Sequence, residues 1–131
     1  MSNEKLIAHW HESSDKNYDD MLAIYKSKRY DWALYIGHLC LEKLLKALYI
    51  KVTGKRDVHY IHNLVKLAVL CNLETSKEVD RKLATVNEFN VEAKYQIEKQ
   101  NFYKMCTKEY TKEQIEVIKE LREWLKQELI K

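Results

Sequence analysis

The sequence predicts an all-α protein: one domain over residues 1–131, folded as an up-and-down bundle of five helices. The length suits a single domain that buries a core without disulfides or a structural metal. Proline is absent and glycine occurs only at Gly37 and Gly54, so the chain has few tight turns. Leu, Lys, Glu and Ala are abundant and have high helix propensity. Short connections make successive helices antiparallel neighbours.

The first two helices are predicted from about Glu4 to Lys26 and from about Trp32 to Val52. Positions expected on the inner face of the first recur every three or four residues: Ile7, Trp10, Ser14, Tyr18, Met21 and Tyr25. Asp31 is the expected cap of the second helix. Its apolar stripe covers more than a third of the circumference, which predicts a central position or a subunit interface. Gly54 is expected to end it in the left-handed conformation.

A short third helix is predicted from about His62 to Cys71. A capping-box pattern at residues 75–78 then starts the fourth helix. The spacing between its successive inward positions alternates between four and three residues as far as about Ile97. This spacing places the polar Asn90 in the seam, where such residues set register or bind a ligand.

The C-terminal part is predicted to contain an irregular segment and a fifth helix. Apolar periodicity is lost from about Gln100 to Tyr110. A second capping-box pattern at residues 111–114 is expected to start the last helix, which runs to the C-terminus.

Composition excludes several classes of protein. The 23 basic and 20 acidic residues give a net charge of +3 and are interspersed, so charge alone gives no nucleic-acid footprint. Three widely spaced cysteines form neither a disulfide framework nor a zinc pattern. A signal segment and an apolar run of membrane-spanning length are both missing, which predicts a cytoplasmic protein without a membrane partner.

The second predicted helix carries a polar stripe of His38, Glu42 and Lys46, each four residues apart. As an exposed ion pair, Glu42 and Lys46 would contribute about 0.2–0.5 kcal/mol. The apolar residues around the stripe favour partial burial instead. In a cleft, Lys43 and Lys46 would hold a phosphate as point charges while Glu42 orients them. Both interpretations stay open at this point.

Further candidates for chemistry lie downstream. His59 and His62 lack a third and fourth ligand at zinc spacing, so neither a metal nor another cofactor is expected. His62 also suits a cap or the surface. Arg56 and His62 are spaced for metal-independent RNA cleavage, with His as acid or base and Arg stabilising the charged intermediate, although such spacing is common by chance. Lys94 could reach a phosphate, and Tyr95 could stack on a base.

Several of these residues together resemble the HEPN domain family. The resemblance extends from Trp10 to Tyr95, and its most specific parts are the run Glu42-Lys43-x2-Lys46-Ala47 and the pair His62-x-Leu64. The resemblance implies a five-helix bundle, usually dimeric, that binds nucleotides or RNA. It also implies frequent pairing with a minimal nucleotidyltransferase in toxin–antitoxin-type systems. Some members of the family are ribonucleases with an Arg-x4-6-His motif.

The resulting prediction is a HEPN-like homodimer that binds a nucleotide, RNA or a nucleotidyltransferase partner. The expected ligand-binding residues are His38, Glu42, Lys43, Lys46, Lys94 and Tyr95. Two alternatives are a metal-independent ribonuclease toxin that uses Arg56 and His62, and a purely structural dimerisation or adaptor domain.

Overall fold

The computed structural model describes residues 1–58 and 60–131, and every regular element in this part of the chain is helical. The elements are α1 (Asn3–Lys26), α2 (Tyr30–Thr53), α3 (Leu64–Leu70), α4 (Lys77–Asn87), the 3₁₀ helix η1 (Val91–Ala93), α5 (Gln96–Met105) and α6 (Lys108–Leu129). The predicted all-α class is confirmed. The predicted count of five helices is wrong, because the described residues contain six α-helices.

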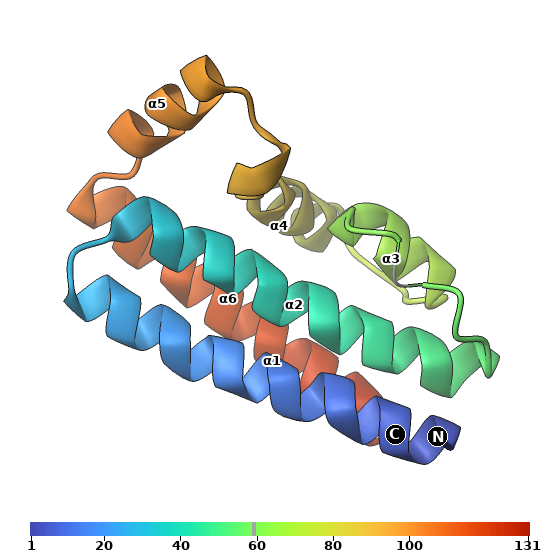
Figure 1. The fold of residues 1–131 in the computed structure, drawn as a ribbon. Helices are drawn as coiled ribbons and strands as arrows, with labels where there is room; N and C mark the ends of the chain where they lie inside the picture. The colour runs from blue at the N-terminus through green and yellow to red at the C-terminus, as the bar shows by residue number, and fades with distance from the viewer. Residues whose placement is uncertain (59) are drawn as a thin grey trace.

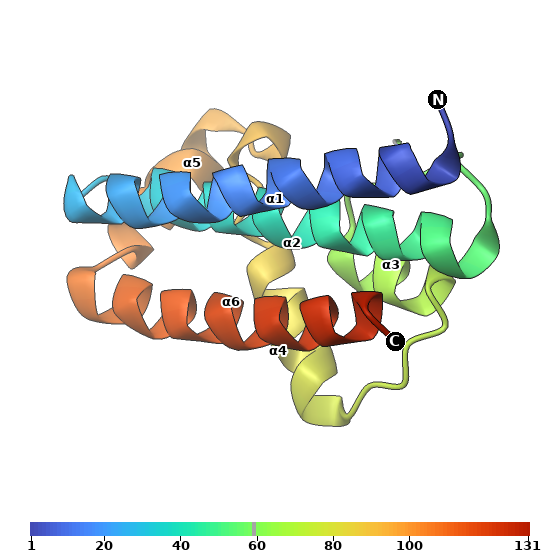
Figure 2. The same cartoon turned by 90° about the horizontal axis from the view of Figure 1, so that it is seen from below.

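The long helices α1, α2 and α6 lie side by side and form the body of the molecule (Figure 1). Helix α4 crosses the direction of these three, as Figure 2 shows, so the arrangement departs from a simple up-and-down bundle. Helices α3 and α4, with η1 between α4 and α5, cover one side of α2. This covered side of α2 carries the polar stripe.

Helix α2 is central, as the width of its apolar stripe predicts. Most of its residues are buried, including the polar His38, Glu42 and Lys46. At Gly37 the neighbouring helices approach closely, since an added Cβ would lie 2.6 Å from Ile118 Cδ1. The three cysteines are free and buried. No helix in the described residues is long and apolar enough to cross a bilayer.

The predicted ends of α2 and α3 are partly confirmed. Gly54 ends α2 with φ of 73°, and its N–H donates to the Ile50 carbonyl. The prediction that Asp31 caps α2 is wrong, because the helix begins at Tyr30 and Asp31 lies in its first turn. Helix α3 begins two residues later than predicted, since the Asn63 side chain accepts the first-turn N–H of Lys66 (3.0 Å).

The fourth predicted helix ends ten residues earlier than expected. It starts after Ser76, whose side chain accepts the N–H of Val79, and stops at Asn87. Phe89 and Val91 are both buried, at 0% and 5% exposure. Residues two apart point to different sides of a helix. A break in the helix is therefore needed to bury both side chains.

The prediction of an irregular segment at residues 100–110 is also wrong. Helix α5 covers most of it, and two residues separate α5 from α6. Only Phe102 is buried in α5, so the helix has little apolar periodicity to detect. Thr107 caps α6 by accepting the N–H of Tyr110, and Thr111 is buried in the first turn instead of capping the helix.

Candidate functional site

The polar stripe of α2 is buried. His38, Glu42 and Lys46 are exposed by 0%, 5% and 3%, so the interpretation as an exposed ion pair is wrong. Tyr35 extends the stripe by one further turn, because it precedes His38 by three residues and is also buried. The α-helical repeat thus places four polar side chains along one line, beneath the segments that follow α2.

Glu42 is the centre of this stripe. Its Oε2 accepts a hydrogen bond from Lys46 Nζ at 3.0 Å and lies 3.2 Å from His62 Nδ1. The Lys46 ammonium also lies over the ring of Trp10 on α1, 5.3 Å from the centroid. The carboxylate is therefore held from α2 and from the segment before α3, and its main cationic partner is held from α1. This arrangement fixes a negative charge inside the fold.

His38 lies against Glu42 without bonding to it. Its Nε2 is 3.9 Å from Glu42 Oε1, which is beyond hydrogen-bond distance. Both ring nitrogens of His38 and the Oε1 atom are buried without a hydrogen-bond partner in the described residues. Burial lowers the pKa of His38 and outweighs the opposing effects of the Glu42 charge and of the nearby His62 backbone. His38 is therefore held neutral.

Tyr35 and Glu92 extend the polar surface toward η1. The Tyr35 ring stacks parallel to that of His38 at 6.4 Å between centroids. Burial, followed by the charge of Glu92 and a hydrogen bond to it, raises the pKa of Tyr35 to about 12. The hydroxyl therefore stays protonated near neutral pH and can donate.

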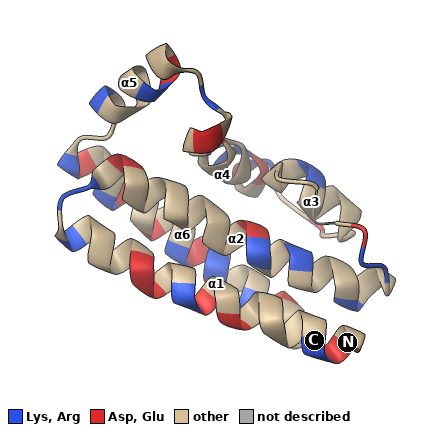
Figure 3. Cartoon of the chain, in the orientation of Figure 1, with Lys and Arg blue, Asp and Glu red and all other residues tan. Residues whose placement is uncertain are grey.

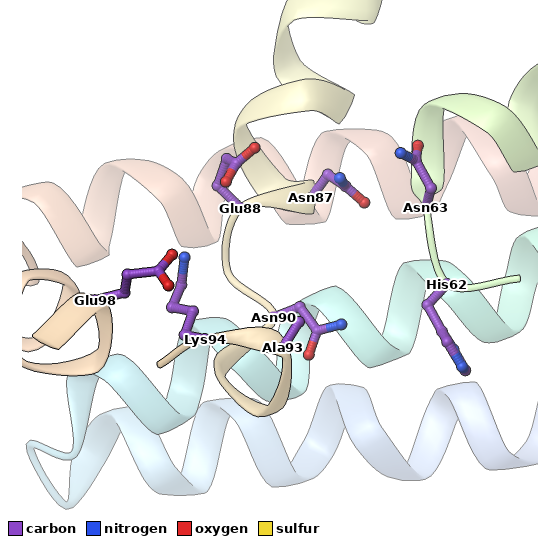
Figure 4. Close-up of a pocket in the computed structure, with 8 residues that line it drawn as sticks. All are labelled: His62, Asn63, Asn87, Glu88, Asn90, Ala93, Lys94 and Glu98. Atoms are coloured by element: carbon purple, nitrogen blue, oxygen red, sulfur yellow. The ribbon is translucent and has the colours of Figure 1, made fainter. Parts of the chain in front are cut away.

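Two adjoining cavities open beside this stripe, and together they form what we call the polar groove. The Glu42 cavity, of about 290 Å³, is lined by Tyr35, Leu39, Glu42, His62, Asn90, Glu92 and Ala93. The Lys94 cavity, of about 280 Å³, is lined by His62, Asn63, Asn87, Glu88, Asn90, Ala93, Lys94 and Glu98 (Figure 4). His62, Asn90 and Ala93 line both cavities, which makes the groove continuous.

Side chains enter the groove from several short segments. In Figure 4, Asn63 and Asn87 lie at one end, Lys94 and Glu98 at the other, and the His62 ring points away from Asn63. Asn87 accepts the backbone N–H of Leu64 at 2.9 Å, which joins the end of α4 to the start of α3. The break after α4 brings Asn90 and Glu92 over α2.

The remaining predicted residues lie at different distances from the groove. Lys94 lines the groove, with its ammonium 5.5 Å from the centre of the Phe102 ring. Tyr95 follows it but is 81% exposed and lines neither cavity. Lys43 is half-buried on a different side of α2, and burial lowers its pKa. Lys43 and Tyr95 therefore do not line the site that Glu42 forms.

Arg56 and His62 are not joined by a hydrogen bond or an ion pair in the described part of the chain. Arg56 donates to the side chain of Asn3 at the start of α1, whereas His62 contacts Glu42. The catalytic pair stays a prediction. His59 lies outside the described residues. Among residues 1–58 and 60–131, no group of three His, Cys, Asp or Glu side chains is placed to hold a metal ion.

Sequence reasoning missed Tyr35 and Glu92 as site residues. Tyr35 could have been found, because its spacing from His38 and Glu42 places it on the same stripe. Glu92 gave no usable signal, since it reaches the groove only through the break after α4. Asn90 was expected in a helical seam, and it lies instead in the turn before η1.

The comparison with protein families agrees with the helical fold. The model of the HEPN domain matches residues 7–129, which extend from α1 to the end of α6 and include the whole groove. No curated protein and no solved structure matches the chain.

Proposed function

This chain belongs to the HEPN domain family, and we propose that it binds a nucleotide or single-stranded RNA in the polar groove. The observation that carries the proposal is Glu42, buried and fixed by Lys46 and His62 at the wall of a cavity. Desolvation makes a buried ion pair a weak source of stability compared with apolar side chains of similar volume. A rigidly held charge facing a cavity is, however, what a binding site requires.

The groove offers the groups that nucleotide recognition uses. Its two cavities, of about 290 and 280 Å³, each suit part of a small ligand. The side chain of His62 is 58% exposed and presents a flat ring for stacking. Asn90 supplies both a donor and an acceptor for hydrogen bonding. Together these side chains support binding of a nucleotide or of one unit of an RNA strand.

Geometry supports binding better than cleavage. The Nδ1 atom of His62 is occupied by Glu42, and Arg56 is held by Asn3 at the start of α1. A general acid or base needs its charge-stabilising partner at the same reacting group. The homodimer and the nucleotidyltransferase partner that the family implies stay predictions.

Isothermal titration calorimetry with the full chain tests this proposal. The ligands are the four 5′-mononucleotides and a short unstructured RNA. Asn90→Ala removes hydrogen-bonding groups from both cavities and should weaken binding roughly tenfold. Asn101→Ala, an exposed position on α5, is the matched control and should bind like the wild type. Absence of binding by every ligand to folded protein would contradict the proposal.

A further inference from the structure

Helix α5 lines a second pair of adjoining cavities, which lie apart from the polar groove. One cavity, of about 480 Å³, lies between α5 and Asp31 in the first turn of α2. The other, of about 270 Å³, is bordered by Lys28 in the connection between α1 and α2. The two cavities share Asp31, Tyr103 and Lys104, and together they form what we call the α5 cleft. Among the described residues, none lines both the α5 cleft and the polar groove, so the cleft is a separate site.

The α5 cleft is basic. Its described lining residues include three lysines, Lys28, Lys99 and Lys104, and one carboxylate, Asp31. None of these lysines forms an ion pair in the described part of the chain. Figure 3 shows blue segments both on α5 and on the connection between α1 and α2, at the same end of the molecule. The fold therefore gathers charges that are far apart in the sequence, and the cleft attracts anions.

Lys28 occupies a backbone position that usually belongs to glycine or asparagine. It follows the C-cap of α1 with φ of 63°, in the left-handed region. Residues other than glycine adopt this conformation only at a cost in free energy. Residues that carry such a cost are concentrated at functional sites. Lys28 thus brings a positive charge to the cleft where glycine would fit the backbone better.

Tyr103 gives the α5 cleft an aromatic surface. Its side chain is 67% exposed and lines both cavities. Sites for single-stranded nucleic acids combine cations along the phosphate backbone with aromatic rings on which bases stack. Gln96 and Gln100 line the same cleft and supply hydrogen-bond donors and acceptors. An acidic peptide would use the lysines but would bring no base to the ring, so these side chains favour RNA.

We infer that the α5 cleft binds the sugar–phosphate backbone of a single-stranded RNA, one nucleotide of which occupies the polar groove. The inference rests on the proposed function and extends it to a second site. Glu98 lines the polar groove and the next residue, Lys99, lines the α5 cleft, so the first turn of α5 lies between the two sites. A helix is about 10–12 Å across with its side chains, a span that a few nucleotides cover.

The distribution of lysines favours this path for the strand. Lys94 is the single lysine among the described residues that line the polar groove. The α5 cleft offers three, so the further phosphates of a strand meet more positive charge there. A mononucleotide in the polar groove does not reach these lysines, whereas a longer strand does.

Fluorescence anisotropy with labelled hexauridylate, beside calorimetry with UMP, tests the inference on the full chain. Hexauridylate should bind at least about tenfold more tightly than UMP, because it reaches both sites. Lys99→Gln and Lys104→Gln should each lower the slope of log affinity against log salt concentration by about 0.7, since each removes one phosphate contact. Binding of UMP should be the same in both variants as in the wild type. Lys66→Gln, exposed on α3 at the other end of α2, is the control and should keep the wild-type slope.

Variants of Tyr103 and Lys28 separate binding from a structural role. Tyr103→Leu should weaken binding of hexauridylate at least about fivefold, whereas Tyr103→Phe keeps the ring and should bind like the wild type. Lys28→Gly should weaken binding of hexauridylate while the protein unfolds at the same or a higher urea concentration, because glycine adopts a φ of 63° without strain. A purely structural role for Lys28 would give unchanged binding.

The outcomes distinguish this inference from the proposed function. Equal affinities for hexauridylate and UMP, an unchanged salt slope in both lysine variants, or equally tight binding of a hexaglutamate peptide would overturn the inference and leave nucleotide binding in the polar groove intact. Absence of binding by both UMP and hexauridylate would overturn both.

Discussion

The buried pair of Glu42 and Lys46 predicts a large loss of stability when one partner is removed. Lys46→Met keeps most of the side-chain volume and removes the ammonium. Glu42 and Lys46 are exposed by only 5% and 3%, with 3.0 Å between Oε2 and Nζ. The variant therefore leaves a buried carboxylate without its main cationic partner. Breaking a pair of this kind costs about 3–5 kcal/mol in the free energy of unfolding.

The surface of the same protein supplies a matched control. Lys82 pairs with Glu78 four residues earlier, as Lys46 does with Glu42, but its side chain is 28% exposed. Lys82→Met should lower the free energy of unfolding much less than Lys46→Met does, because solvent screens the pairs that Lys82 makes with Glu78 and with Glu120. Both variants are measured by urea unfolding at pH 7. A slope of unfolding free energy against urea concentration equal to that of the wild type indicates that two-state behaviour is kept.

A double variant isolates the effect of the Glu42 carboxylate that has lost the Lys46 ammonium. Glu42→Gln added to Lys46→Met removes that charge and should recover a substantial part of the lost stability. A loss of stability in Lys46→Met no larger than that in Lys82→Met would refute the placement of the pair inside the fold.

Three further predictions follow from other parts of the structure. Gly37→Ala should lower the free energy of unfolding by roughly 1–2 kcal/mol, because the new Cβ would lie 2.6 Å from Ile118 Cδ1 and 2.8 Å from the sulfur of Met21; urea unfolding with unchanged stability would contradict this close packing. Burial lowers the pKa of His38 below 6.5, so its contribution to stability is complete above pH 6.5 and is lost as the pH falls below that value. The stability of the wild type relative to His38→Leu should therefore decrease between pH 7.5 and pH 5.5, and a constant difference would exclude this role. In the presence of EDTA, RNA should stay equally intact with the purified wild type, Arg56→Ala and His62→Ala. Degradation of RNA by the wild type that is lost in His62→Ala would favour the ribonuclease alternative.

Sequence patterns were sufficient for the long helices and for the centre of the site. Strong apolar periodicity and the single glycine at its end made α2 recognisable, and the regular spacing of its polar residues placed Glu42 and Lys46 on one stripe. The resemblance to the HEPN domain family, which is now confirmed, included the pair His62-x-Leu64 among its most specific parts. His62 contacts Glu42, twenty residues earlier in the chain.

The end of α4, the existence of α5 and the position of Glu92 depend on tertiary contacts that local sequence patterns do not reveal. The four-three spacing of apolar residues continues through residues 86–97, although the helix ends at Asn87 so that Phe89 and Val91 are both buried. Helix α5 buries only Phe102 and therefore has almost no periodic signal. Because the break after α4 was not predictable, neither was the approach of Glu92 to Tyr35.

Mapping of NMR chemical shifts during titration with CMP is the most direct test of nucleotide binding in the polar groove. If CMP binds there, the largest amide shifts should occur at His62, Asn90 and Ala93, the residues shared by the two cavities, and should saturate with one affinity. Shifts centred on Lys43 and the facing surface of α1, or the absence of any shift at millimolar CMP, would contradict it.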